Sequence, residues 1–185
     1  MRKFITLVAA LLVASAANAV EIAGVKVDDK ANVGGQELVL NGAGLRTKVV
    51  FKVYVASLYV PAKAGSSAAV LETGVRRIQL NLMRDVSADE FVGALIDGMK
   101  ANNSVAEIAA VKAETDQFIA IMKGAGAVKE KDVVTLDFID GATKIGLNGA
   151  AKGTVPGAAF NRALTKVWLG DQPVQADLKK AMLGG

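Results

Sequence analysis

Two glycine-containing dipeptides constrain the fold of this chain more than any other feature. Asp140-Gly141 and Asn148-Gly149 separate short runs in which apolar and polar residues alternate. Asp-Gly and Asn-Gly favour two-residue hairpin turns, because a type I′ turn needs a positive φ at both of its central positions. The sequence therefore predicts three consecutive antiparallel strands, over residues 132–139, 143–147 and 150–155.

Alternating patterns elsewhere predict further strands. Residues 20–27 and 36–40 form a hairpin-like pair across residues 28–35, and the glycines of 41–44 predict a turn. The longest strand is expected over Val49–Val60, with Lys52, Tyr54, Ala56 and Leu58 on one face and Phe51, Val53, Val55 and Ser57 on the other. A loop over 62–67 and a strand over Arg76–Met83 follow.

Two capping boxes mark helix starts. Ser87 with Glu90, and Ser104 with Glu107, place an N-cap serine three residues before a glutamate. The second helix is expected to bury Ile108, Val111, Phe118, Ile119 and Met122, and to stop at Gly124. Two more helices are predicted, from Pro156 or Gly157 to Trp168 and over Ala176–Leu183. This order of strands and helices predicts one α+β domain, an antiparallel sheet with helices packed on one face.

The N-terminus has the pattern of a secretory signal peptide. Arg2 and Lys3 precede an apolar stretch, and Ala17-Asn18-Ala19 is a small-x-small cleavage site. We expect 1–19 to be removed, leaving 20–185 as the domain, with no stable membrane insertion afterwards because the apolar run is too short to span. Removal of the two basic residues lowers the formal net charge from +4 to +2. Such a weak and scattered charge does not favour nucleic acid as a partner.

The chain contains no histidine and no cysteine. A Ser-His-Asp triad, a thiolate nucleophile, c-type haem attachment and the usual zinc and copper sites are thereby excluded. We expect no metal and no cofactor, and any catalysis would depend on Arg, Lys, Tyr, Asp or Glu.

Four segments resemble the chalcone isomerase-like family, and specifically its exported bacterial branch. They are NGAGLR (41–46), FKVYVASLYVP (51–61), SADEFVGALIDGMKANN (87–103) and FNRALTKVWLGDQPVQADLKKAMLG (160–184). The resemblance implies an open-faced β-sandwich of chalcone isomerase type, with a ligand cleft between sheet and helices. It also implies a periplasmic location.

The resemblance also implies site residues. Arg46 looks like the family arginine, which in plant isomerases holds or activates the oxygens of the chalcone. Together with a tyrosine, here at the position of Tyr54, that arginine holds the fatty-acid carboxylate in the fatty-acid-binding members. The isomerases carry a threonine where this chain has Tyr54, and a helix tyrosine where it has Phe91. The favoured function is therefore non-catalytic binding of a fatty acid or similar amphipathic carboxylate, and the alternative is an isomerase (an intramolecular lyase) acting on a chalcone-like enone.

Structural explanations compete for several of these residues. Arg46 could pair with Glu37, Asp132 or another surface carboxylate, and Tyr54 could be a core or rim aromatic. Lys52 is expected to be solvated and Trp168 to lie in the core. The remaining polar candidates are explained by helix ends: Asp89 and Glu90 by a first helical turn, and Asn102 and Asn103 by a helix C-terminus or by cleft lining.

Overall fold

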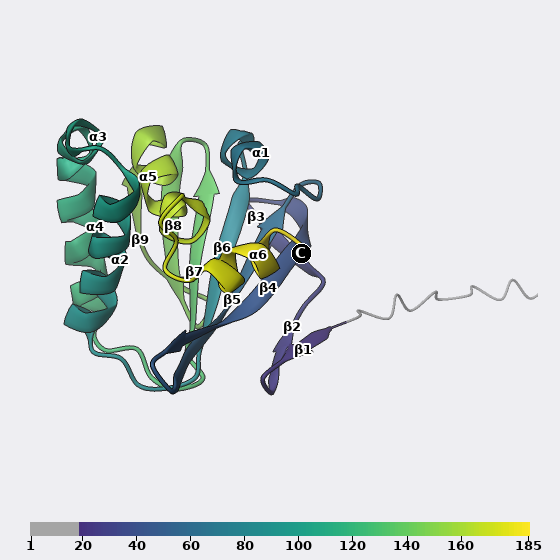
Figure 1. Ribbon diagram of the computed structural model, residues 1–185. Coiled ribbons are helices and arrows are strands. Elements are labelled where there is room, and N and C mark those ends of the chain that lie inside the picture. The colour runs from purple at the N-terminus through teal and green to yellow at the C-terminus, as the bar shows by residue number, and fades with distance from the viewer. Residues whose placement is uncertain (1–18) are drawn as a thin grey trace, which may run out of the picture.

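A computed structural model describes residues 19–185, so nearly all of the predicted signal peptide lies outside the described residues. The main sheet has seven antiparallel strands in the order in which they occur along the chain, from β3 to β9 (Figure 1). Its strands are β3 (Lys30–Val33), β4 (Gln36–Lys48), β5 (Phe51–Val60), β6 (Arg76–Leu82), β7 (Val133–Ile139), β8 (Ala142–Leu147) and β9 (Ala150–Pro156). A separate hairpin is formed by β1 (Val20–Ile22) and β2 (Val25–Val27).

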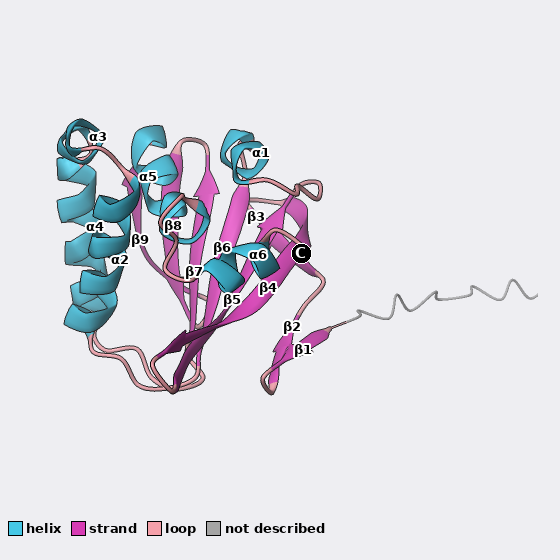
Figure 2. Cartoon of the chain, viewed as in Figure 1, coloured by secondary structure: helices cyan, strands magenta, loops and turns pink. Residues whose placement is uncertain are grey.

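Helices cover one face of this sheet (Figure 2). They are α1 (Ser67–Glu72), α2 (Ala88–Asn102), α3 (Val105–Ala110), α4 (Lys112–Ala125), α5 (Ala158–Leu169) and α6 (Ala176–Met182). Both predicted capping boxes are present, at Ser87 with Glu90 and at Ser104 with Glu107. The α+β class and the antiparallel sheet with helices on one face are confirmed. None of the helices within residues 19–185 has the length and apolar character needed to cross a membrane.

The two faces of β5 serve two cores, as its alternation predicts. Tyr54, Ala56 and Leu58 point into the large core between sheet and helices, where Trp168 is fully buried. Val55 and Tyr59 point into a smaller core on the opposite face, together with Val27 of the β1–β2 hairpin. Among the described residues, both cores are built from residues after position 20.

The predicted turn at 41–44 is wrong, because β4 runs through it with a register irregularity between Leu40 and Gly42. The glycines serve close packing instead. A Cβ on Gly42 would lie 2.1 Å from the carbonyl oxygen of Ala181, and one on Gly44 would lie 2.9 Å from the Ala181 Cβ. Backbone of the α6 region therefore lies directly against β4.

Four other boundaries differ from the sequence expectation. The strand expected over Val49–Val60 begins only at Phe51, because Val49 and Val50 form the turn after β4, and β4 is longer than β5. Residues 20–27 are two strands that turn at Ala23-Gly24, and the partner of β4 is β3, from the region predicted as a connection. The helix that begins after Ser104 breaks at Val111 into α3 and α4. The short helix α1 begins inside the predicted loop, with Ser66 as its N-cap.

Candidate ligand-binding site

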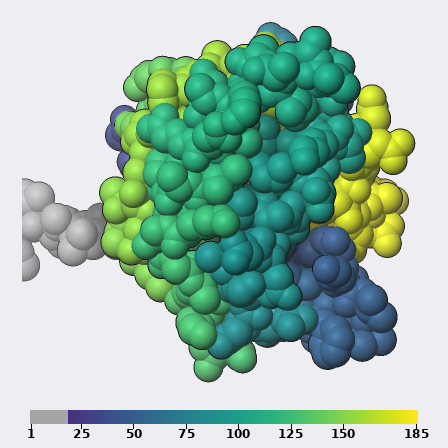
Figure 3. Space-filling model, turned by 90° about the vertical axis from the view of Figure 1, so that its left-hand side faces the viewer, coloured from purple at the N-terminus to yellow at the C-terminus, as the bar shows by residue number. Residues whose placement is uncertain are grey.

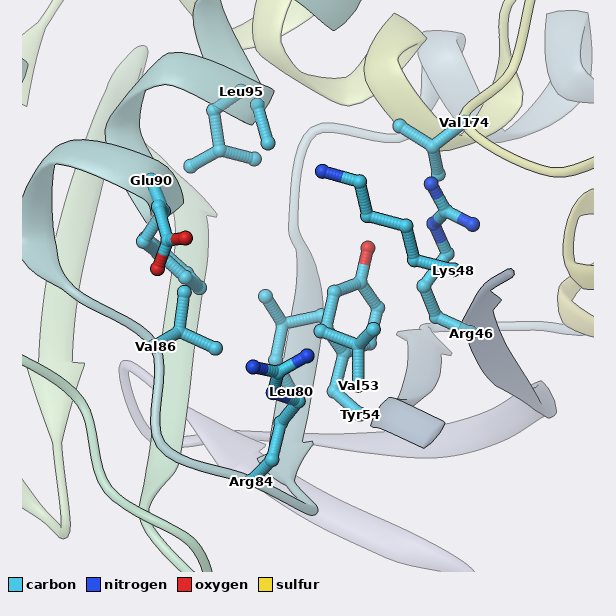
Figure 4. Close-up of a pocket in the computed structure, with 12 residues that line it drawn as sticks. Arg46, Lys48, Val53, Tyr54, Leu80, Arg84, Val86, Glu90, Leu95 and Val174 are labelled. Carbon is cyan, nitrogen blue, oxygen red and sulfur yellow. The ribbon is translucent and has the colours of Figure 1, made fainter. Parts of the chain in front are cut away.

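A cavity of about 120 Å³ lies between the sheet and the helical layer. Its floor is formed by β4, β5 and β6, and α2 and the segment before α6 form its walls (Figure 4). Most of its lining is apolar, including Val53, Leu80, Phe91, Leu95 and Val174. Both sequence-predicted site residues, Arg46 and Tyr54, line it.

Local backbone irregularity and one distant glutamine position Arg46. The β4–β5 register shifts between Arg46 and Thr47, and such bulges redirect side chains. Gln175 Oε1 accepts hydrogen bonds from the Thr47 backbone N–H at 2.9 Å and from Arg46 Nη1 at 3.3 Å. Gln175 Nε2 donates to the Leu45 carbonyl at 3.1 Å. The N-cap residue of α6 therefore fixes the strand at the arginine.

No carboxylate neutralises Arg46 among the described residues. Its Nη1 donates to the Thr47 carbonyl and to the Gln175 amide, both of which are neutral. Glu37 is instead paired with Lys30 at 2.8 Å, and Asp132 accepts from the Lys129 backbone N–H at 2.7 Å. The structural alternative that Arg46 pairs with Glu37 or Asp132 is therefore wrong.

Tyr54 presents its hydroxyl to the cavity from the floor. In the view of Figure 4 the hydroxyl lies just below the Lys48 side chain, with the Arg46 guanidinium beyond Lys48. The oxygen accepts a hydrogen bond from Trp168 Nε1 at 3.1 Å. Burial raises the pKa of Tyr54, and the indole hydrogen bond and the Arg46 charge oppose that rise. Because Trp168 uses the oxygen as an acceptor, the neutral phenol keeps its own proton as a donor.

The cavity rim carries more positive than negative charge. Lys48 and Arg84 line it with Arg46, and Glu90 is the one carboxylate in the lining. The pKa of Glu90 is lowered mainly by hydrogen bonds from Ser87, which it caps, and also by the charges of Arg84 and Lys48. Net positive charge beside an apolar interior favours an anionic amphiphile.

Other polar residues singled out from the sequence have structural roles. Asn102 lies outside the cavity and joins α2 to the segment after α5, donating to the Gln172 carbonyl at 2.7 Å and accepting from its N–H at 2.7 Å. Asn103 donates to the Ala163 carbonyl at 3.2 Å. Lys52 is exposed, as expected, and Asp89 pairs with Lys123 on the surface. Trp168 lies in the core and also supports the site through Tyr54.

Sequence reasoning missed four contributors to this site: Gln175, Val174, Lys48 and Arg84. Gln175 and Val174 belong to the segment 160–184 that resembles the family, and this resemblance could have indicated them. Lys48 and Arg84 flank strand ends and have no signature of their own. Among residues 19–185, no group of three acidic residues is placed to hold a metal ion.

Residues 19–184 match the chalcone isomerase-like family, and the chain belongs to that family. A search of curated proteins returned no match. Among solved structures, the chain is similar to the crystal structure of a fatty-acid binding protein from Arabidopsis thaliana. The TM-score is 0.68 at 14% identity, covering 90% of this chain and 96% of that one. The similarity confirms the open-faced, chalcone isomerase-like fold.

Proposed function

We propose that this protein binds a fatty acid or a similar amphipathic carboxylate without transforming it. The observation that carries the proposal is Arg46, whose guanidinium has no carboxylate partner among residues 19–185 and lies at an apolar cavity that Tyr54 also lines. A planar guanidinium meets a carboxylate with two parallel hydrogen bonds, and a phenol can add a third. The structural relative named as a fatty-acid binding protein supports the same ligand class.

The cavity size defines how the ligand would lie. At about 120 Å³ the cavity is close to one that holds benzene, of roughly 150 Å³. Benzene has six heavy atoms and a carboxylate has three, so the cavity has room for a carboxylate and about the first three carbons of a chain. A longer tail would continue out of the cavity mouth or displace side chains of α2 such as Leu95.

The cavity lining favours binding over isomerisation. Phe91 lines the cavity where the resemblance to isomerases implies a tyrosine, and Tyr54 occupies the position of their threonine. The hydroxyl groups expected of the isomerases at these positions are therefore replaced by a ring without one and by a phenol bonded to Trp168. Arg46 and the Tyr54 phenol remain as donors to a developing enolate, without the threonine and the helix tyrosine of the isomerases.

We also propose that the chain is exported and acts in the periplasm of a bacterium. The charged start, apolar run and small-x-small site of 1–19 support this. Intact-mass measurement of the protein from separated cell fractions tests it. A mass for 20–185 in the periplasmic fraction is expected, and uncleaved protein in the cytosol would contradict it.

Two measurements on purified 20–185 test the function. Titration with a saturated fatty acid series from two to sixteen carbons should show saturable binding, whose affinity rises steeply over the first few carbons and more slowly beyond. Incubation with a chalcone should leave the enone absorbance to decay at its spontaneous rate. Cyclisation above that rate would identify an isomerase, and absence of saturable binding would remove the binding proposal.

A further inference from the structure

The turn between β4 and β5 exposes an apolar tip beside the cavity. Val49, Val50 and Phe51 are 90%, 79% and 58% exposed and are consecutive in the chain. In the space-filling view, the segment around residue 50 forms a lobe at the lower right that projects beside α2 and the C-terminal segment (Figure 3). Water-exposed turns of two residues are normally built from Gly, Asn or Asp.

The backbone at this tip is also unfavourable for its sequence. Val49 has a φ of 58°, in the left-handed region where β-branched residues are outliers. The other two-residue turns of the sheet obey the usual preference, with Asp140 and Asn148 at φ of 53° and 52° before glycines. Val49 departs from this turn preference at an exposed position, which indicates that the residue has a role other than stability.

Basic side chains surround the tip and have no carboxylate partners among residues 19–185. They are Lys48, Lys52 and Arg84, and the Arg84 guanidinium lies 5.2 Å from the centre of the Phe51 ring. Two carboxylates of the adjoining 83–90 segment have hydrogen-bond partners of their own. Asp85 accepts from Lys129 Nζ at 3.1 Å, and Glu90 accepts from the Ser87 hydroxyl at 3.1 Å.

We infer that the β4–β5 tip docks the protein on a lipid bilayer that carries anionic headgroups. Shallow insertion of a few apolar side chains, with basic residues at headgroup level, gives the two weak signals that together hold a peripheral protein on a membrane. The tip is convex and offers only three apolar side chains. A stable protein interface takes about 20 residues from each partner, so the tip is too small for one.

The placement of the tip gives this docking a consequence. Lys48 and Arg84 belong both to the basic ring and to the cavity lining. A membrane contact at the tip therefore brings the cavity mouth to the lipid surface, where amphipathic ligands concentrate. The docking itself does not depend on what the cavity binds.

Vesicle flotation with purified 20–185 tests the inference. We expect binding to vesicles of phosphatidylcholine mixed with phosphatidylglycerol, weaker binding at high salt, and little binding to phosphatidylcholine alone. The double variant Val49→Asn/Val50→Gly places a favoured hairpin dipeptide at the tip, so its melting temperature should stay or rise while vesicle binding falls about tenfold or more. Lys52→Glu should weaken binding about fivefold or more.

The matched control is Val105→Ser, which removes an apolar side chain that is 88% exposed on α3. Its vesicle binding should equal that of the wild type. Equal vesicle binding by the wild type and Val49→Asn/Val50→Gly would overturn the inference. Equal binding of the wild type to neutral and to anionic vesicles would overturn it as well. If the wild type does not bind vesicles but forms dimers, and the double variant is monomeric, the inference is overturned and the tip is a self-association surface.

Discussion

Arg76 and Arg46 both lack a carboxylate partner among residues 19–185, yet their surroundings differ completely. Arg76 on β6 is 3% exposed and donates to Thr165 Oγ1 at 2.7 Å, to the Asn161 carbonyl at 3.2 Å and to the Thr73 carbonyl at 3.1 Å. Its guanidinium also lies 4.5 Å from the centre of the Phe138 ring. Arg46 has two neutral acceptors and faces a cavity.

The comparison separates a structural arginine from a site arginine. Around Arg76, neutral acceptors and an aromatic face take the place of a counter-ion, and burial lowers its pKa to about 10, which still leaves it charged at neutral pH. Around Arg46, donors remain available beside an apolar space. A missing counter-ion is therefore not enough to indicate a ligand. The informative feature is unused donor capacity directed at a cavity.

The largest expected effect is on stability at Arg76. Arg76→Ala removes a donor from the Thr165 hydroxyl and from two carbonyls, of which that of Asn161 keeps its bond from Thr165 Oγ1. It also opens a cavity in the core, and the change should cost about 3–5 kcal/mol of unfolding free energy. Chemical denaturation measures it. Arg76→Met, which keeps much of the volume, should lose clearly less. If Arg76→Ala left the free energy of unfolding nearly unchanged, Arg76 would not be a structural arginine.

The next effect is on affinity at Arg46. Arg46→Ala should weaken fatty-acid binding by roughly 2–4 kcal/mol, because the ligand carboxylate loses its bidentate partner. Arg46→Lys should restore only part, since a point charge cannot reproduce the planar fork. Calorimetric titration gives the affinity, and thermal unfolding without ligand should change little. A marked fall in melting temperature with unaltered affinity would place Arg46 among the structural arginines.

A single substitution at Gln175 should give Arg46 the carboxylate partner that it lacks. Gln175→Glu puts a carboxylate at the atom that now accepts from Arg46 Nη1 and Thr47 N. It should compete with the ligand and lower fatty-acid affinity by about 1–2 kcal/mol. The loss of the Nε2 donor to the Leu45 carbonyl should offset the stability gained from the new ion pair. Gln175→Ala is the control, with a stability loss of about 1 kcal/mol. Unchanged affinity in Gln175→Glu would show that Arg46 does not contact the ligand.

The smallest effect is in tyrosine ionisation. Burial raises the pKa of both tyrosines, that of Tyr59 to about 12. A folded-state pKa above the unfolded value of about 10 stabilises the fold below pH 10, and this contribution is lost as the pH rises from 10 to 12. Phenolate absorbance should stay flat through pH 10 in the native protein. Arg46→Ala should delay the ionisation of Tyr54 further, because that arginine favours the phenolate. Normal titration of both tyrosines near pH 10 would contradict the buried geometry.

Local signals made most of the fold predictable. Asp140 and Asn148 adopt the positive φ their turns require, and both capping boxes close. Long-range packing set what the sequence reasoning missed. Gly42 looked like a turn residue because nothing local shows that Ala181 would lie against it. The real turn at Val49-Val50 breaks the residue preference on which prediction depends.

The site was predictable only where a motif named it. Arg46 and Tyr54 were placed at the cavity by resemblance, and the structure brings them together, although their ligand role stays a prediction. Gln175 lies more than a hundred residues from Thr47 in the chain, and no sequence pattern predicts the hydrogen bond between them. Lys48 and Arg84 became part of the site only when the sheet and α2 came together around one cavity.

The most direct test of the central claim compares a fatty acid with the alcohol of the same chain length. Both carry the same apolar tail, so the ratio of their dissociation constants isolates the headgroup. We predict that the wild type binds the acid at least tenfold more tightly, the equivalent of about 1.4 kcal/mol, and that Arg46→Ala abolishes this preference while keeping its affinity for the alcohol. Equal affinities in the wild type, or a preference that survives in Arg46→Ala, would show that Arg46 does not recognise a carboxylate.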